Sequence, residues 1–327
     1  MGEQMWAVIV EEDQPLKIGT TEKPICGDND VLVEVMTAGL NRADLVQRRG
    51  LYPPPPGASH IMGLECAGTI VARGAAVTDW AIGDRVCGLL AGGGYAEFAA
   101  VDQGSLFKIP DAMSFEEAGA LPEVMMTVWA NIFDRCQFKS GETALIHGGT
   151  SGIGTMAIQM LKSAGATSIM ITAGSAEKCA FATELGADRA INYREEDFEQ
   201  IVRDAGGADV ILDMVGGDYV QKNISAAKVG GRIVNIAYMQ GPQVNLNLMP
   251  LMLKRLILTG TTLRARPNPE KQRIRDAVLA DFWPDVLSGT IKPIIDTVYS
   301  FEQAEQAQAH MAVGGHIGKI LLSRQQS

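Results

Sequence analysis

The chain has 327 residues, of which 46% are hydrophobic and 6% aromatic, and it carries a formal net charge of −10. This length and composition predict two globular domains with a large apolar core. The acidic balance disfavours nucleic acid or an anionic membrane surface as a partner. No apolar run reaches membrane-spanning length, and the first ten residues lack a basic start and a cleavage site, so we expect neither a membrane span nor a secretory leader.

Residues 1–122 show short alternating strands separated by turn-forming clusters, which predicts a mostly β domain. The expected strands are Trp6–Val10, Val31–Val35, Ala67–Ala72 and Tyr95–Ala99. The run Pro53–Pro56 fixes a stiff extended loop in this domain.

A glycine-rich turn follows in the next segment of the chain. The apolar run Ala144–Ile146 enters the turn Gly148–Gly152, and a helical pattern comes next, in which Ile153, Ala157, Ile158, Met160 and Leu161 share a face. Backbone N–H groups at a helix start carry partial positive charge and bind a pyrophosphate. The turn therefore predicts cofactor contacts at Gly149, Thr150, Ser151, Gly152 and Ile153, although such a turn by itself can be only a tight turn.

Strands and helices then alternate, which predicts a doubly wound parallel sheet of the Rossmann type over residues 123–267. The expected elements are the strand Ser168–Thr172, the helix Glu177–Leu185, the strand Ala190–Tyr193, the helix Glu195–Asp204, the strand Ala208–Asp213, a helix after Gly217 and the strand Gly231–Ile236. The first βα turn of such a sheet is where a dinucleotide binds.

The last segment, residues 268–327, is expected to return to the β domain. Its pattern predicts one helix over Lys271–Leu287, a strand over Pro293–Tyr299, a helix over Phe301–Met311 and a strand over Ile317–Leu322. The five cysteines are scattered without metal-ligand spacing, and we expect them to be free thiols in a reducing cytoplasm.

Several motifs in order resemble those of the medium-chain dehydrogenase/reductase superfamily. They are Asn41–Leu45, Gly50–Gly57, Gly63–Glu65, Ile82–Val86, Gly92–Glu97, His147–Gly154, Leu185–Asp188 and His316–Lys319. The match covers essentially the whole chain and is most similar to the zinc-free NADPH:quinone oxidoreductases of zeta-crystallin type, in their tumour-suppressor-inducible subgroup. The resemblance implies a GroES-like β domain plus a Rossmann domain, with the active site in the cleft between them.

Compared with the zinc-dependent members of that family, this chain lacks the residues that bind catalytic zinc. Asn41 stands where they carry the first cysteine, and Leu64 stands in place of the histidine of Gly-His-Glu. The third position falls near Glu123, and the cysteine-rich lobe for structural zinc is missing. We therefore expect no metal ligand in this chain. His147 is interpreted as a turn or packing residue.

The expected cofactor is NADP(H). Enzymes that use NAD place an acidic residue at the end of the second Rossmann strand, where this chain has Gly174 and Ser175. The resemblance implies that Lys178 and Tyr193 contact a 2′-phosphate, although Lys178 can also be a solvated helix residue beside Glu177. Ser151 departs from the fingerprint, because it occupies the place of the second glycine.

The remaining candidate site residues depend mostly on the resemblance. It implies that Asn41 and Thr127 flank the nicotinamide and that Tyr238, Leu263 and Lys319 line the cofactor cleft. Tyr52, in the proline-rich loop, is the candidate catalytic residue, because it can stack on a substrate ring or donate a hydrogen bond. A purely structural role stays open for each of these residues.

The sequence thus predicts a cytoplasmic NADPH:quinone oxidoreductase that transfers hydride without zinc. A 2-alkenal or enoyl reductase is one alternative, and a cofactor-regulated RNA-binding or structural protein is another, which the acidic charge disfavours. The apolar stretch Arg255–Thr261 predicts an edge strand through which two copies form a homodimer, unless it is an interior strand covered by its own helix.

Overall fold

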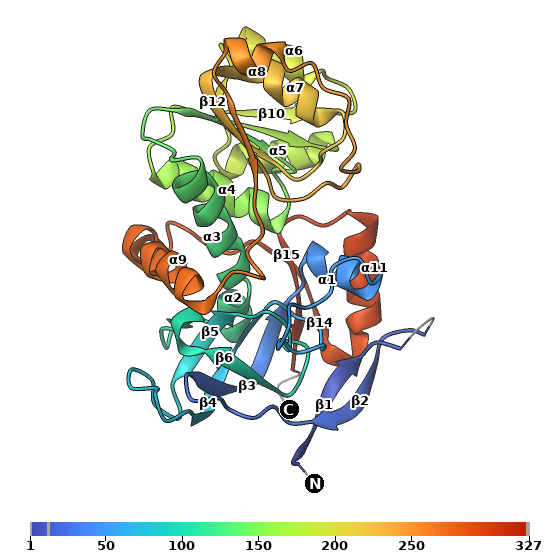
Figure 1. Cartoon of the computed structure of the whole chain (residues 1–327), viewed down its shortest axis with the longest axis vertical. Helices are drawn as coiled ribbons and strands as arrows, with labels where there is room; N and C mark the ends of the chain where they lie inside the picture. Colours follow the sequence, from blue (N-terminus) through green and yellow to red (C-terminus); the bar gives the residue numbers. More distant parts are fainter. Residues whose placement is uncertain (1, 12–13, 325–327) are drawn as a thin grey trace. The chain divides into compact units, whose positions relative to one another are not determined.

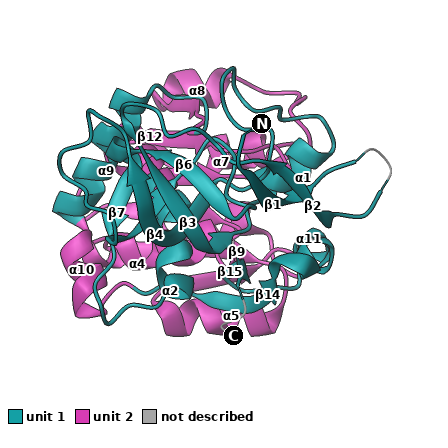
Figure 2. Cartoon of the chain, turned by 90° about the horizontal axis from the view of Figure 1, so that it is seen from below, with its two compact units in different colours: residues 1–126, 264–281, 292–327 teal, residues 127–263, 282–291 magenta. Residues whose placement is uncertain are grey.

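The computed structural model describes residues 2–11 and 14–324, and the chain divides into two compact units. Unit 1 contains residues 1–126, 264–281 and 292–327, and unit 2 contains residues 127–263 and 282–291 (Figure 2). Within the described residues, none of the helices combines the length and the apolar character needed to cross a membrane.

Unit 1 is built mainly of strands (Figure 1). Its elements are β1 (Gln4–Ile9), β2 (Lys17–Glu22), β3 (Asp30–Gly39), α1 (Arg42–Arg48), β4 (Glu65–Arg73), β5 (Arg85–Leu89), β6 (Phe98–Asp102), η1 (Gln103–Ser105), β7 (Leu106–Lys108), α2 (Phe115–Gly119), α9 (Asn268–Asp281), β14 (Ile295–Ser300), η3 (Phe301–Gln303), α11 (Ala304–Val313) and β15 (Lys319–Ser323). The helix α3 (Pro122–Val128) begins in unit 1 and ends in unit 2.

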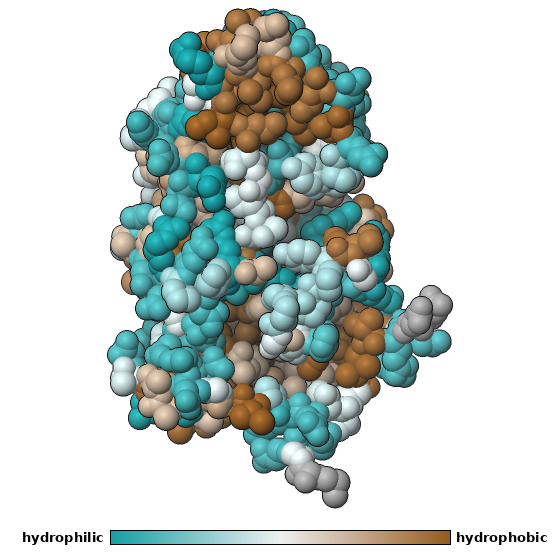
Figure 3. Space-filling model, in the orientation of Figure 1, coloured by the Kyte–Doolittle hydropathy of each residue, from teal (hydrophilic) through white to brown (hydrophobic). Residues whose placement is uncertain are grey.

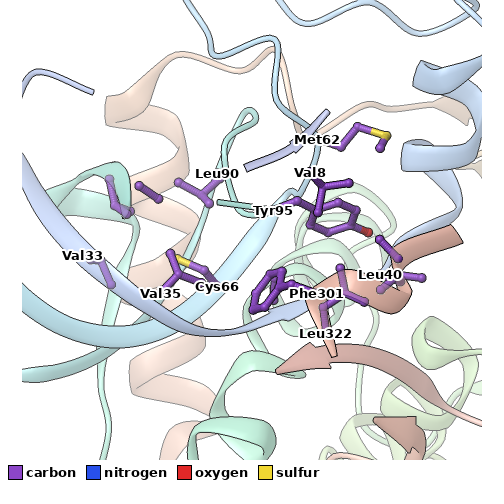
Figure 4. Packing of buried hydrophobic residues seen from close by; sticks show 14 of the residues in the cluster. Val8, Val33, Val35, Leu40, Met62, Cys66, Leu90, Tyr95, Phe301 and Leu322 are labelled. Carbon is purple, nitrogen blue, oxygen red and sulfur yellow. The ribbon is translucent and has the colours of Figure 1, made fainter. Parts of the chain in front are cut away.

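A seven-stranded sheet forms the centre of unit 1. Its order is β14-β15-β3-β4-β5-β7, and β6 also pairs with β3. All its pairs are antiparallel except β14 with β15, and a separate hairpin joins β1 to β2. Val33 and Val35 lie two residues apart on β3 and therefore on the same face of the strand. Both are buried with Tyr95, Phe301 and Leu322 in one apolar cluster (Figure 4). The C-terminal strand β15 therefore completes the sheet that the N-terminal segment begins.

Unit 2 alternates strands with helices. Its elements are η2, a π-helix (Trp129–Arg135), β8 (Thr143–His147), α4 (Gly152–Ser163), β9 (Ser168–Ala173), α5 (Ala176–Leu185), β10 (Arg189–Asn192), α6 (Phe198–Asp204), β11 (Ala208–Asp213), α7 (Tyr219–Ala226), β12 (Ala227–Asn235), α8 (Met249–Leu253), β13 (Ile257–Gly260) and α10 (Trp283–Ser288).

The six strands of unit 2 form one parallel sheet in the order β10-β9-β8-β11-β12-β13. Counted within the unit, this is the order 3-2-1-4-5-6 of the Rossmann fold, in which the chain reverses direction across the sheet between β8 and β11. Ligands of such sheets bind outside the carboxyl ends of the strands at this reversal. The predicted fold class, a β domain combined with a doubly wound parallel sheet, is confirmed.

The helices of unit 2 begin and end at residues that the sequence marks. Ser151 and Ser175 cap α4 and α5, each by accepting a hydrogen bond from the backbone N–H three residues further on. Gly186 ends α5 with a φ of 127°, which a residue with a side chain adopts only under strain. These signals explain why the predicted bounds of α5 agree closely with the structure.

The single helix predicted over Lys271–Leu287 is wrong, because the structure has two helices there. The helix α9 ends at Asp281, and α10 starts at Trp283 with Pro284 in its first turn. Proline lacks a backbone N–H and disfavours helical geometry at the residue before it. The apolar residues keep a helical spacing past residue 281, but the backbone does not continue the helix there.

Two other elements start later than predicted. The strand expected over Tyr95–Ala99 is β6, which begins at Phe98, whereas Tyr95 uses its carbonyl to accept from the backbone N–H of Val8. The helix expected from Glu195 begins at Phe198, because Asp197 provides the cap for α6.

The division into units differs from the expected domain bounds at residues 282–291, which cluster with unit 2 although the sequence placed all of 268–327 with the β domain. Phe282 packs on Phe133 with ring centroids 4.8 Å apart, and Asp285 accepts a hydrogen bond from Ser163. Aromatic packing and one polar contact therefore hold this segment to unit 2.

The strand β13 lies at one end of the sheet of unit 2, so the alternative of an interior strand is wrong. Its first residue, Ile257, is 54% exposed. Exposed apolar side chains of the neighbouring α8 and of the segment before it continue this surface: Leu248, Met249, Met252 and Leu253. Figure 3 shows this hydrophobic area over the part of unit 2 that carries α8. We call these five residues the α8–β13 patch.

Candidate functional site

The glycine-rich turn of unit 2 joins β8 to α4 at the carboxyl edge of the sheet. Gly149 donates its backbone N–H to Thr172 O at 2.9 Å, and the Ser151 side chain accepts from Gly154 N at 3.0 Å. A Cβ at Gly154 would lie 2.3 Å from Gly148 O, so only glycine lets α4 approach the turn this closely. Ser151 replaces the second fingerprint glycine without strain, because its backbone is extended and its hydroxyl caps the helix.

This turn fits an anionic group. The helix α4 has 12 residues, and its first turn presents N–H groups from Gly152 and Ile153, which have no partner within the helix. Thr150, within the turn, is buried. The turn provides oriented backbone dipoles rather than a charged side chain, which is the chemistry that holds a pyrophosphate.

A second group of predicted residues meets at the ends of β9 and β10. A Cβ at Gly174 would lie 2.7 Å from the Tyr193 hydroxyl, so the tyrosine covers this glycine. Ser175 caps α5 by accepting from Lys178 N at 3.2 Å. Gly174, Ser175, Lys178 and Tyr193 are thus neighbours, and no acidic residue ends β9. Tyr193 is 45% exposed and available to a ligand.

A buried polar chain that the sequence analysis missed lies below these turns. Thr172 Oγ1 lies 3.0 Å from His147 Nδ1, and His147 Nε2 lies 2.7 Å from Asn223 Oδ1. Asn223 and Asn235 both donate to Asp213 Oδ2, at 3.1 and 2.9 Å. Since Asn223 uses its amide nitrogen on Asp213, its oxygen accepts, and the proton of His147 is on Nε2.

This chain explains His147. Burial lowers the pKa of its imidazole, although the nearby Asp213 charge opposes the shift, so His147 is neutral at pH 7. Its ring also packs edge-on against Phe198 and Tyr219. The signal available in the sequence was a polar residue at the end of each of four parallel strands, Thr172, His147, Asp213 and Asn235, which share one edge of the sheet.

Asp213 also shapes the loop that follows β11. Its Oδ1 accepts from Val215 N at 2.7 Å and from Gly216 N at 3.1 Å. Tyr238, which is 47% exposed, packs so close to Gly216 that a Cβ there would lie 2.7 Å from its ring. Tyr238 lines a small pocket at the ends of β12 and β13, together with Asn235 and Gly260.

Thr127 and Leu263 are the first and last residues of the longer segment of unit 2. Thr127 is buried, and its carbonyl accepts from Asn131 Nδ2 at 2.8 Å. Asn131 Oδ1 in turn accepts from Thr261 Oγ1 at 2.5 Å, two residues before the half-buried Leu263. Asn131, which lies in the π-helix η2, therefore connects the two ends of this segment.

In unit 1, the predicted residues Asn41 and Lys319 meet at a buried carboxylate. Lys319 Nζ donates to Glu65 Oε1 at 2.6 Å, Asn41 Oδ1 at 2.8 Å and Leu40 O at 2.8 Å. Asn41 Nδ2 donates to the same Glu65 oxygen at 3.0 Å. The three ammonium protons match these three acceptors, so Lys319 positions Asn41 and leaves no proton for a further acceptor.

A second buried carboxylate, Asp44, lies on α1 beside this group. It accepts from Tyr95 Oη at 2.9 Å, Asn41 N at 2.7 Å and Gly63 N at 3.3 Å. Burial raises the pKa of Asp44 to about 6, and the hydrogen bonds and the Lys319 charge limit the rise. Figure 4 shows the Tyr95 ring packed between Val8 and Leu40.

Tyr52 is half-buried in the proline-rich loop and is held by Arg264, a residue that the sequence analysis did not select. Arg264 Nη1 donates to Tyr52 O at 3.0 Å, and its guanidinium carbon lies 5.2 Å from the centre of the Tyr52 ring. Burial raises the pKa of the Tyr52 phenol, while the Arg264 charge opposes the shift, so the phenol is protonated at pH 7. No sequence motif marks Arg264, since its importance comes from contacts distant in the chain.

The positions that carry zinc ligands in related enzymes hold a poor donor set here. Asn41 is engaged by Lys319, Leu64 is apolar and buried, and Glu123 is near enough to donate its backbone N–H to Glu65 Oε2 at 2.9 Å. Across residues 2–11 and 14–324, no three histidine, cysteine or acidic side chains are grouped so as to hold a metal ion.

Comparison with known proteins places these features in one family. Residues 27–111 match the alcohol dehydrogenase GroES-like domain, and residues 152–280 match the zinc-binding dehydrogenase domain. The chain is 30% identical to the quinone oxidoreductase of Sus scrofa over 304 residues, which cover 91% of this chain and 90% of that protein. It is also 30% identical to the synaptic vesicle membrane protein VAT-1 homolog of Danio rerio, of whose length it spans 65%.

Solved structures agree with these sequence matches. A quinone oxidoreductase of Pseudomonas syringae pv. Tomato is similar with a TM-score of 0.83 and 30% identity, over 99% of this chain and 100% of that one. The CurK enoyl reductase is similar with a TM-score of 0.83 and 26% identity, over 98% of this chain and 99% of that one. The predicted GroES-like and Rossmann folds are confirmed.

The buried Asp44 predicts a pH dependence of stability. Its pKa is about 6 in the folded protein against an ordinary value of 3.8, so the folded state binds more protons between these values. The free energy of unfolding should therefore fall as the pH rises from 4 to 6, by about 3 kcal/mol from this group. Urea unfolding across pH 4–7 should show a flatter profile for Asp44→Asn than for the unmodified protein.

The exposed Asp79 provides the matched control, because Asp79→Asn removes a carboxylate of unit 1 that remains in water. It should leave the profile unchanged. An Asp44→Asn profile with the same slope as the unmodified protein would contradict the assignment.

Proposed function

The chain belongs to the medium-chain dehydrogenase/reductase superfamily, and from this premise we propose that it is an NADPH:quinone oxidoreductase that works without zinc. It is an oxidoreductase of a family that uses nicotinamide nucleotides. The observation that carries the finer proposal is the buried group of Asn41, Glu65 and Lys319, in which an amide and an ammonium stand where relatives hold a metal.

NADPH as the nucleotide is supported by the surroundings of the β9 end. A ribose 2′-hydroxyl is normally held by an acidic residue at this point, and the chain offers Gly174 and Ser175 there. A 2′-phosphate carries negative charge, which Lys178 and the Tyr193 hydroxyl can receive. The acid nearest in sequence, Glu177, is exposed and can turn to solvent.

The poor metal-donor set at Asn41 and Leu64 favours an acceptor that needs no Lewis acid. When bound, the reduced nicotinamide supplies hydride. A quinone that receives hydride becomes a hydroquinone anion, which is stable enough to leave without help from a metal. The protein then contributes mainly orientation, which is worth roughly 7–11 kcal/mol for well-placed reactants. Tyr52, protonated and half-buried, offers a stacking face and one hydrogen-bond donor.

Reduction of 2-alkenals or enoyl groups is the second candidate. The similarity to an enoyl reductase structure and the protonated Tyr52 phenol favour it. Hydride addition to an enone gives an enolate whose carbon must be protonated, so this reaction depends on a placed acid far more than quinone reduction does. An RNA-binding or purely structural role has less support, given the net charge of −10.

We also propose a homodimer formed across β13. The strand lies at the open end of the parallel sheet, and the α8–β13 patch exposes five apolar side chains beside it. An exposed apolar edge strand is a site of association, and a second copy can pair with it across a two-fold axis.

A cytoplasmic location is proposed from the five cysteines, all of which are free thiols. Cell fractionation that recovers the protein in a membrane or secreted fraction would contradict this proposal.

The first prediction from this function concerns the nucleotide. NADPH should give a higher kcat/KM than NADH, and Lys178→Glu should lower the value for NADPH by about tenfold to a hundredfold, because a charge-assisted contact is worth roughly 1.5–3 kcal/mol. Steady-state kinetics with both nucleotides measure this. Lys162→Glu, on the exposed side of α4, is the control and should keep the preference. Equal use of both nucleotides by the unmodified protein would refute it.

The second prediction concerns metal. Protein purified without chelators should contain no stoichiometric zinc by elemental analysis, and chelators should leave its turnover intact. About one zinc per chain, with activity lost on removal, would overturn the argument from Asn41 and Leu64.

The third prediction concerns the dimer. Ile257→Lys places a charge in the proposed interface and should weaken dimerisation by about a hundredfold to several thousandfold, since an unpaired buried charge costs roughly 3–5 kcal/mol. Light scattering over a concentration series measures this. Val313→Lys, at a residue of unit 1 that is 85% exposed, should have no effect. A monomeric unmodified protein at micromolar concentration would disprove the proposal.

The fourth prediction separates the two reductase candidates. A quinone reductase should turn over ortho- or para-quinones much faster than 2-alkenals. In such an enzyme, Tyr52→Phe should change kcat little, and any loss should appear as a higher KM. An alkenal reductase should lose about 10²–10⁴-fold in kcat in the same variant. The control is Tyr299→Phe, because the Tyr299 hydroxyl is hydrogen-bonded to His310. Faster turnover of alkenals, with collapse of kcat in Tyr52→Phe, would favour the second candidate.

A further inference from the structure

Arg264 is a buried cation without a carboxylate partner. Its side chain is 5% exposed, and it forms no ion pair with any acidic residue that the structure describes. Its three hydrogen-bond acceptors are neutral: Ala91 O at 2.7 Å from Nε, Tyr52 O at 3.0 Å from Nη1 and Gln47 Oε1 at 2.8 Å from Nη2. Burying a guanidinium on neutral acceptors alone is costly, so this arrangement needs an explanation.

Another of the buried cations of unit 1 shows the contrast. Lys319 lies against the carboxylate of Glu65 and uses all three of its protons. Arg264 has five N–H groups, of which three are used, and one remains on each of Nη1 and Nη2. Asp44 acts on Arg264 only through its field, because the oxygens of Asp44 are taken by Tyr95, Asn41 and Gly63. Two N–H groups of Arg264 therefore have no hydrogen-bond acceptor among the described residues.

Tyr52 defines where such a ligand would bind. The Arg264 guanidinium lies over the Tyr52 ring, and the same arginine holds the Tyr52 carbonyl, so the two side chains form one rigid pair. A planar ring stacked near Tyr52 would bring an oxygen substituent toward the free N–H groups of Arg264. Both residues belong to unit 1.

We propose that Arg264 binds the oxyanion of the hydroquinone that forms when a quinone accepts hydride, and that it is a catalytic residue of this enzyme. The inference rests on the proposed quinone reductase function. The C–H bond of the reduced nicotinamide breaks, the hydride forms an O–H bond at one quinone oxygen, and the electron pair moves through the ring to the opposite oxygen. The quinone is reduced, the nucleotide is oxidised, and water later protonates the phenolate that Arg264 stabilises.

Arginine suits this role better than a proton donor. A guanidinium keeps its charge at every relevant pH, so it stabilises the phenolate without delivering a proton that must then be replaced. Fixed donors directed at a developing oxyanion act at full strength, because they need no rearrangement during the reaction. Tyr52 supplies the neighbouring stacking surface, so we expect its hydroxyl to be expendable for quinones and the Arg264 guanidinium to be required.

The test compares Arg264→Gln and Arg264→Lys with the unmodified protein on a series of para-benzoquinones whose hydroquinones differ in acidity. Arg264→Gln should lose about 10²–10³-fold in kcat with KM nearly unchanged, as on loss of an oxyanion donor. Arg264→Lys, which keeps a charge, should retain part of the rate. The loss should be largest for the most basic hydroquinone anions. A merely structural role would lower all rates by the same factor, and this result would overturn the proposal.

Binding of 4-nitrophenol provides a readout that is independent of turnover. Its phenolate absorbs in the visible and imitates the hydroquinone anion. The unmodified protein should lower the pKa of bound 4-nitrophenol, and Arg264→Gln should abolish that shift. Arg266→Gln, which removes an arginine paired with Glu270, should bind like the unmodified protein.

The two measurements separate failure of the inference from failure of the function. If the protein reduces no quinone but lowers the pKa of bound 4-nitrophenol through Arg264, the quinone reductase proposal is rejected and the oxyanion site is kept. The role of Arg264 is rejected if Arg264→Gln reduces quinones as well as the unmodified protein does. It is also rejected if this variant lowers the pKa of bound 4-nitrophenol equally. If Arg264→Gln does not fold, Arg264→Lys carries both tests, and an unchanged dependence on hydroquinone acidity would count against the inference.

Discussion

The buried ion pair between Lys319 and Glu65 is the interaction on which unit 1 depends. It joins β15, the last strand of the chain, to β4, and through Asn41 it fixes the start of α1. Two charges taken out of water are tolerated only where every remaining lone pair and proton has a partner. Here Glu65 also accepts from Asn41 and from the backbone of Glu123. Gly39 leaves the space, because a Cβ there would lie 2.2 Å from the carboxylate.

Unit 2 also contains a buried carboxylate, which is stabilised without an opposing charge. Asp213 is buried at the end of β11, and four hydrogen-bond donors hold it, two from the backbone and two from asparagines. The neutral His147 extends this network to the strand beneath the glycine-rich turn. The polar network thereby fixes the carboxyl ends of adjacent strands, which is the edge where a nucleotide must find a rigid surface.

The parallel sheet could be predicted from the sequence because its signals are local. Strand runs, caps such as Ser175 and the stop at Gly186 act within a few residues, so the order of elements in unit 2 followed directly. The prediction failed at Pro284, where apolar periodicity was given more weight than backbone chemistry. Among the site residues, Gly174 and Tyr193 were predicted as cofactor contacts, and the structure brings these two residues together. Arg264 was missed, because its partners lie about 170 to 220 residues away, and a lone arginine carries no period or motif.

The thiols of this chain have a consequence for an enzyme that would handle quinones. Burial raises the pKa of every cysteine, to about 12 for Cys66 and Cys136, and in the same direction for Cys26, Cys87 and Cys179. Quinones are electrophiles that arylate thiolates, and only the deprotonated sulfur reacts at a useful rate. Burial therefore lowers the thiolate fraction of these cysteines at neutral pH and slows their arylation by the compounds that the chain is proposed to reduce. The core packing that folds the chain thus also shields its buried thiols, Cys66, Cys87 and Cys136, from electrophiles.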